Sequence, residues 1–123
     1  MTESSSNSLP AAALGTAGIS SAITADEFLH ALAQMDAAMA QVVRRAGQGC
    51  GPDCERRLDH SSRGLRALLG PDCADVVTDV IDAARRVLTA ADPSAPLMML
   101  TMARQTLAAV VHRQAARATR KVA

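Results

Sequence analysis

The most reactive side chains in the sequence belong to three cysteines, Cys50, Cys54 and Cys73. Thiolates bind zinc and softer metals, and a site would need a further ligand from one of the histidines, His30, His60 and His112. Cys50 and Cys54 flank a Gly-Pro-Asp turn, but Cys54 and Cys73 begin successive helices and should lie about 25 Å apart. We therefore expect incidental thiols, no metal and no cofactor, with Cys50 and Cys54 as the only candidate ligands.

No motif in the sequence predicts catalysis. It contains no nucleophile, base and orienting group at a recognisable spacing, no phosphate-binding glycine loop and no paired-histidine metal motif. Phe28 is the one aromatic residue, which excludes aromatic-lined substrate pockets and base-stacking surfaces. The sequence thus predicts a protein that is not an enzyme.

Three methionines, Met98, Met99 and Met102, lie close together near the C-terminus. Consecutive helical residues point in different directions, so Met98, Met99 and Leu100 cannot all be buried within one chain. Methionine is flexible and adapts to many surfaces. We expect a protein interface here, which also includes Pro93, Pro96 and Leu97 from the preceding turn.

Charge changes sign along the chain, although the formal net charge is only +1. Residues 1–43 carry four acidic and no basic residues, and residues 93–123 carry five basic and no acidic ones. This predicts pairing of acidic and basic ends between chains, beside the ordinary preference of cations for helix C-termini. Arg113 and Arg117 begin a basic stripe and join the expected interface; without interleaved aromatic residues the stripe does not predict nucleic-acid binding.

Composition and spacing predict an all-α protein, because alanine, leucine and arginine are frequent and β-branched residues are few. Thr24 and Glu27 form a capping box that starts the first helix. The sequence Gly-Pro-Asp-Cys occurs at 51–54 and again at 70–73, where glycine ends one helix and proline begins the next. With a third boundary at Asp92–Pro96, the predicted helices span 25–46, 52–69, 71–91 and 96–121.

The hydrophobic spacing also predicts which residues form the core. In the first helix they follow at 4-3-4-3 spacing: Phe28, Leu32, Met35, Met39 and Val42. In the second, weakened by Ser61, Ser62 and Gly64, they are Leu58, Leu65 and Leu68. In the third they are Cys73, Val77, Val80, Ile81, Ala84, Val87 and Leu88. In the fourth they are Leu100, Ala103, Leu107 and Val110, after which Gln114 and Arg117 occupy the seam, so the tail should leave the core.

Residues 1–23 are rich in serine, threonine, alanine and glycine and lack helical periodicity, which predicts a flexible leader. The remaining residues, 24–123, should form three to four amphipathic helices packed as a small antiparallel bundle that ends in a helical hairpin. The sequence contains no run of eighteen apolar residues, so it does not predict a membrane span. The expected partner is a protein, either a second copy or a helical partner.

The layout resembles the inner-rod and needle subunits of bacterial type III secretion systems. The similar features are the Ser/Thr-rich leader, the run Met35–Met39 with Phe28 before it, and the hairpin closed by Asp92-Pro93-Ser94-Ala95-Pro96. The helix that follows starts with Leu97-Met98-Met99-Leu100, and His112-Arg113-Gln114-Ala115 with Thr119 and Lys121 is similar to needle subunits. The resemblance covers residues 24–44 and 77–121, whereas residues 47–73 have no counterpart.

The resemblance implies a structural subunit that is made in the bacterial cytoplasm and exported to the cell envelope or secreted. Two other functions fit the residues. One is a cytosolic helical-bundle adaptor, chaperone or regulator that binds a protein through its Met-rich face. The other, which rests only on the cysteines, is a small metal or thiol-redox protein.

Overall fold

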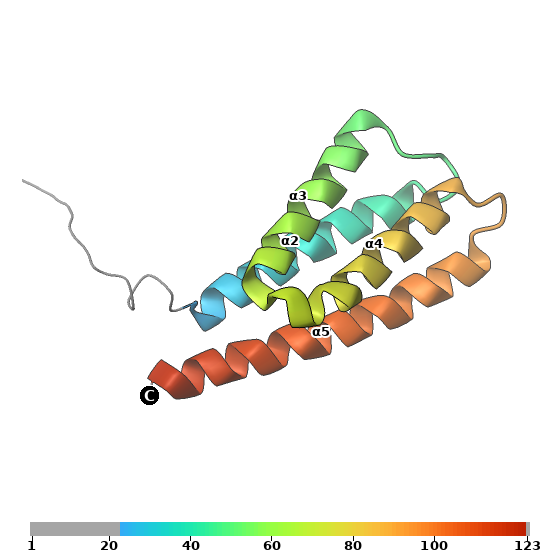
Figure 1. Cartoon of the computed structure of the whole chain (residues 1–123). Helices are drawn as coiled ribbons and strands as arrows, with labels where there is room; N and C mark the ends of the chain where they lie inside the picture. The colour runs from blue at the N-terminus through green and yellow to red at the C-terminus, as the bar shows by residue number, and fades with distance from the viewer. Residues whose placement is uncertain (1–22, 123) are drawn as a thin grey trace, which may run out of the picture.

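A computed structural model describes residues 23–122 of the chain. Within this range the protein is an all-α bundle, as predicted, in which successive helices run in opposite directions (Figure 1). The helices are α2 (Ala25–Arg44), α3 (Pro52–Leu69), α4 (Ala74–Thr89) and α5 (Ser94–Val122), with a single 3-10 turn, Pro71–Cys73, before α4. The predicted flexible leader lies outside the described residues, apart from Ile23, which packs against the core.

The start of α2 is the predicted capping box. The Glu27 N–H donates to the Thr24 hydroxyl at 3.2 Å, and the Thr24 N–H donates to the Glu27 carboxylate at 3.0 Å. Two of the free N–H groups at the helix start are thereby satisfied.

The first helix was predicted to end at residue 46, but α2 ends two residues earlier, at Arg44. The chain turns away there to reach α4. Gly47 and Gly49 adopt φ values of 77° and 84°, which favour glycine, and their N–H groups donate to the Val87 and Leu88 carbonyls at 2.9 and 2.7 Å. The loop thus satisfies carbonyls at the C-terminus of α4 that have no partner within that helix.

The core contains the whole predicted seam of α2 and most of the predicted residues elsewhere. Three predictions were wrong in detail. Leu68 is half-buried while its neighbour Leu69 is buried, Cys73 is half-buried because it lies in the 3-10 turn before α4, and Ala103 is half-buried at the edge of the α4–α5 contact.

The prediction that the tail of α5 leaves the core was also wrong. Val111, Ala115 and Ala118 are buried and continue the inner seam, although Arg117 is exposed and Gln114 is half-buried. α5 packs against both α4 and α2 (Figure 1). Because α4 begins only at Ala74, the long helix needs α2 to cover part of its inner face.

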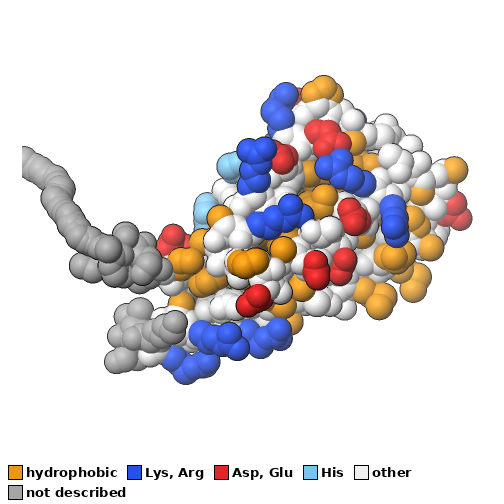
Figure 2. All heavy atoms as spheres, in the orientation of Figure 1, with side chains coloured by type: hydrophobic (Ala, Val, Ile, Leu, Met, Phe, Trp, Pro, Cys, Tyr) orange, Lys and Arg blue, Asp and Glu red, His pale blue; other side chains and the backbone are white. Residues whose placement is uncertain are grey.

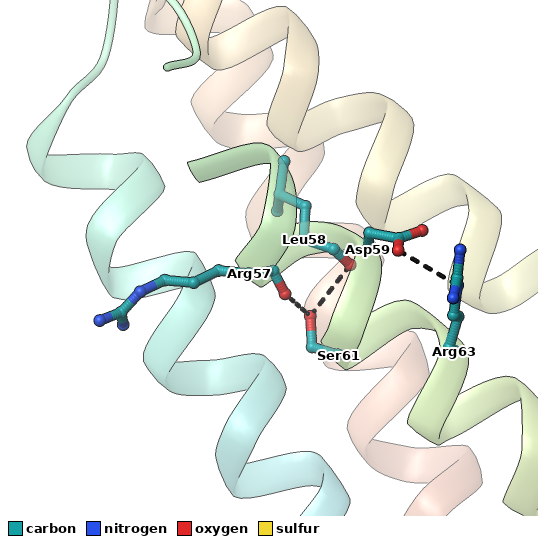
Figure 3. Close-up of polar contacts among 5 residues, drawn as sticks. All are labelled: Arg57, Leu58, Asp59, Ser61 and Arg63. Carbon is teal, nitrogen blue, oxygen red and sulfur yellow. Dashed lines mark hydrogen bonds and ion pairs between the residues drawn. The ribbon is translucent and has the colours of Figure 1, made fainter. Parts of the chain in front are cut away.

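The serines of α3, which the sequence marks only as residues that weaken the helix, turn inward. Ser61 and Ser62 are both buried. The Ser61 hydroxyl lies within hydrogen-bond distance of the Arg57 and Leu58 carbonyls, at 2.9 and 3.2 Å (Figure 3). A polar side chain is therefore accommodated where α3 meets α2, since its hydroxyl is satisfied by its own helix.

Candidate protein interface on α5

The turn into α5 is held by its own polar groups. Asp92 accepts hydrogen bonds from the Ser94 hydroxyl at 2.7 Å and from the Ser94 N–H at 3.1 Å. These two bonds stabilise the carboxylate and lower the pKa of Asp92 below its usual 3.8. The Leu97 N–H then donates to the Pro93 carbonyl at 2.8 Å. The corner between α4 and α5 is fixed without help from the rest of the bundle.

The predicted start of α5 at Pro96 was two residues late, because the helix begins at Ser94. Pro96 is accommodated in the first turn, where a missing N–H leaves no hydrogen bond unmade. Pro93 and Pro96 are both half-buried. They fix the corner, and the residues that follow them supply the exposed surface.

The methionines that follow the corner project into solvent. The exposed fractions are 68% for Met98, 48% for Met99 and 64% for Met102, whereas Leu100 between them is 1% exposed. This confirms the prediction that Met98, Met99 and Leu100 cannot all be buried. The methionines account for three of the five exposed large hydrophobic side chains among the described residues. Leu97, which precedes the methionines, is half-buried and packs against the core.

A groove of about 360 Å³ lies beside the methionines, between α4 and α5. Met99, Met102 and Ala103 line its α5 side. On the α4 side its lining residues are Asp79, Asp82, Ala83 and Arg86. The groove combines an apolar wall with two carboxylates and the Arg86 guanidinium, which leaves one negative charge and suits a helix that carries both apolar and basic side chains.

Sequence reasoning missed the α4 side of this groove. The signal was present, since Asp75, Asp79, Asp82 and Arg86 follow at 4-3-4 spacing and must share one face of α4. All four are exposed. The sequence did not show which neighbouring helix this face would adjoin.

The other predicted interface residues, Arg113 and Arg117, lie farther along α5. Both are exposed, and neither lines the groove. Figure 2 shows the basic side chains grouped over the C-terminal half of α5, with acidic side chains over α4 on the same face. Pairing of acidic and basic segments was expected between chains; among residues 23–122 it also occurs once within the chain, where the Arg104 guanidinium lies 3.3 Å from the Asp36 carboxylate of α2.

The thiol pair lies at the other connection, between α2 and α3. Cys50 and Cys54 are both half-buried, and partial burial together with the S–H···S contact to Cys54 raises the pKa of Cys50 from 9.0 to about 12. Nearby Glu55 adds to this effect, and its own pKa is lowered chiefly by the hydrogen bond from Arg85, 2.5 Å away on α4. A thiol held protonated in this way is a poor nucleophile and a poor metal ligand.

Cys73 lies beyond the other end of α3, so it cannot complete a site with Cys50 and Cys54. The three histidines are exposed. Within residues 23–122, no three His, Cys, Asp or Glu side chains come together as a set of metal ligands. A second groove, of about 390 Å³, adjoins Cys54 and is lined by Gln41, Arg45 and Arg57 among others.

None of the helices in the described part of the chain has the length and hydropathy needed to cross a membrane. Comparisons with models of protein families, with curated proteins and with solved structures found no match.

Proposed function

We propose that the protein is a non-enzymatic assembly subunit that acts by protein–protein contact through the exposed face of α5. The observation that carries this proposal is the apolar surface of Met98, Met99 and Met102, which stands beside a groove on a corner fixed by its own hydrogen bonds. Exposed apolar side chains that are grouped in this way typically mark a site of protein contact. A rigid corner also reduces the entropy lost on binding.

The finer form of the proposal is that the subunit belongs to a type III protein secretion apparatus, as an inner-rod or needle-like component. It is supported by the resemblance of residues 24–44 and 77–121 to those subunits. The chain would then be made in the bacterial cytoplasm and exported to the cell envelope or secreted. The methionine surface supplies the contact that assembly requires.

The alternative is a helical-bundle adaptor, chaperone or regulator. A specific observation favours it, because the C-terminal half of α5 is packed into its own bundle through Val111, Ala115 and Ala118. Only the outer side of that helix is free to contact another molecule. An adaptor needs one such face, whereas a subunit that is surrounded by neighbours in a filament needs several.

Photo-crosslinking in the native cell tests both forms of the proposal. A photoreactive phenylalanine analogue at position 102 should form a specific adduct, identified by mass spectrometry. An adduct with a component of a secretion apparatus supports the finer form, and one with a single soluble partner supports the adaptor. A matched control at Ala67, which is exposed on α3, should give none. Failure to obtain an adduct from position 102, or equal labelling from both positions, would contradict the proposed function.

A further inference from the structure

The outer face of α5 carries a second regular seam, on the side of the helix away from the core. Exposed residues recur at 4-3-4-3-4 spacing through Met98, Met102, Gln105, Ala109, His112 and Ala116. This spacing is the one by which two helices pack along their length. The methionines lie at one end of the seam, and the two alanines lie toward the other, with His112 between them. Two copies running in opposite directions would therefore place methionine against alanine.

Charges flank this seam on the side where α4 lies, and they also change sign along it. Asp79 and Asp82 of α4 lie beside the methionine end, at the groove that includes Met102. Arg113 and Arg117 lie beside the alanine end. Figure 2 shows basic side chains over the C-terminal half of α5 and acidic side chains over α4 on the same face. None of these four forms an ion pair with another described residue; the pairs found there are Arg56–Asp53, Arg63–Asp59, Arg85–Glu55 and Arg104–Asp36.

We infer that the outer face of α5 binds a second copy of this chain, in an antiparallel pair with a twofold axis at Ala109. The inference rests on the proposed use of this face and names its occupant. A twofold axis at position 109 places Met102 opposite Ala116 of the second copy. It also keeps α4 of both copies on the same side of the helix pair, since rotation about this axis does not exchange the two flanks.

The same register brings the charges together. Arg113 falls level with position 105 of the second copy and Arg117 level with position 101, on either side of Met102 and Ala103, which line the groove together with Asp79 and Asp82. Each copy then supplies two arginines and two aspartates, so four complementary pairs form around a short apolar seam. Complementary charges of this kind fix the register of a complex, and they weaken as salt screens them.

The experiment is sedimentation equilibrium of the full chain and three variants over a range of salt concentrations. The double reversals Arg113→Asp/Arg117→Asp and Asp79→Arg/Asp82→Arg should each weaken the dimer by about tenfold or more. The quadruple variant, which restores opposite signs across the axis, should recover most of that loss. Circular dichroism of each variant checks that the bundle is intact.

A second measurement tests the position of the axis. Ala109→Cys, in a background with Cys50, Cys54 and Cys73 replaced by serine, should form a disulfide-linked dimer on mild oxidation by copper phenanthroline. Ala33→Cys, at an exposed site on α2, is the matched control and should remain monomeric. Head-to-tail packing would not bring two copies of position 109 together. A parallel, in-register pair would, but it would also join two copies of Met102→Cys, which the antiparallel register places opposite Ala116 and which should stay monomeric.

Three results would overturn the inference: a wild-type monomer at all accessible concentrations, no recovery in the quadruple variant, or no disulfide at position 109. If these occur while position 102 still crosslinks specifically to another protein in the cell, the second copy is rejected and the proposed function stands. If position 102 also gives no adduct, both fail.

Discussion

Apolar residues recur at regular spacing on both faces of α5, but the inner face is buried in the bundle and the outer face is exposed. The inner face buries Leu100, Leu107, Val111 and Ala118 against α4 and α2. The outer face exposes Met98 and Met102, together with Ala109 and Ala116. Because the exposed side chains gain little from the folding of one chain, their apolar character needs another explanation. The proposed contact with another molecule would provide it.

The largest expected effect comes from shortening a side chain on the inner face. Leu107 is fully buried, so Leu107→Ala removes apolar contacts and leaves a cavity. The free energy of unfolding should fall by about 2–5 kcal/mol, measured by urea denaturation. The matched control is Met102→Ala on the outer face, studied at a concentration where the chain is monomeric. It should change the free energy of unfolding by less than about 0.5 kcal/mol. Equal losses would contradict the distinction between the two faces.

The next largest effect tests whether the tail of α5 belongs to the core. Ala118→Asp places a carboxylate where the alanine is buried, so the unfolding free energy should fall by about 1–3 kcal/mol. Ala116→Asp introduces the same charge two residues away on the exposed face. At monomeric concentrations it should cost little. If both variants unfold alike, the tail is not packed as described.

A smaller effect is expected at the flank of α5, where Arg104 meets Asp36 of α2. The pair is largely exposed, so Arg104→Ala should cost no more than about 1 kcal/mol, and less at high salt. A double-mutant cycle with Asp36→Ala isolates the coupling. A coupling energy independent of salt would show that Arg104 stabilises α5 by packing and not by charge.

The smallest effect concerns pH at the start of α5. Hydrogen bonds from Ser94 lower the pKa of Asp92 in the folded chain, so its contribution to stability is present above the unfolded pKa of 3.8. That contribution is lost as the pH falls through the folded value. An NMR titration should place the Asp92 carboxyl below 3.8, and Ser94→Ala should move it back toward 3.8. An unchanged midpoint would show that the corner is held by other contacts.

Much of the fold could be predicted because its signals are local. The capping box at Thr24 and Glu27, the α2 seam and the proline-marked helix boundaries each depend on residues within a few turns of one another. The exposure of at least one of Met98, Met99 and Leu100 followed from geometry alone, since consecutive helical residues point in different directions; the structure exposes the two methionines and buries Leu100.

The errors came from features that local spacing does not determine. A strict 4-3 seam continued along α5 reaches Gln114 and Arg117, but a straight helix of 3.6 residues per turn drifts from that repeat. The buried positions are therefore Val111, Ala115 and Ala118. The α4 side of the groove was missed for a related reason, because the packing of α4 on α5 decides where Asp79 and Asp82 lie.

The central proposal is that the outer face of α5 binds a second copy of the chain, and sedimentation velocity of the full chain with Met102→Asp tests it most directly. A charge at this position is tolerated in water but is costly in a desolvated interface. The account predicts that the variant loses the self-association of the wild type while its helical circular dichroism is unchanged. A variant that associates as the wild type does would contradict it.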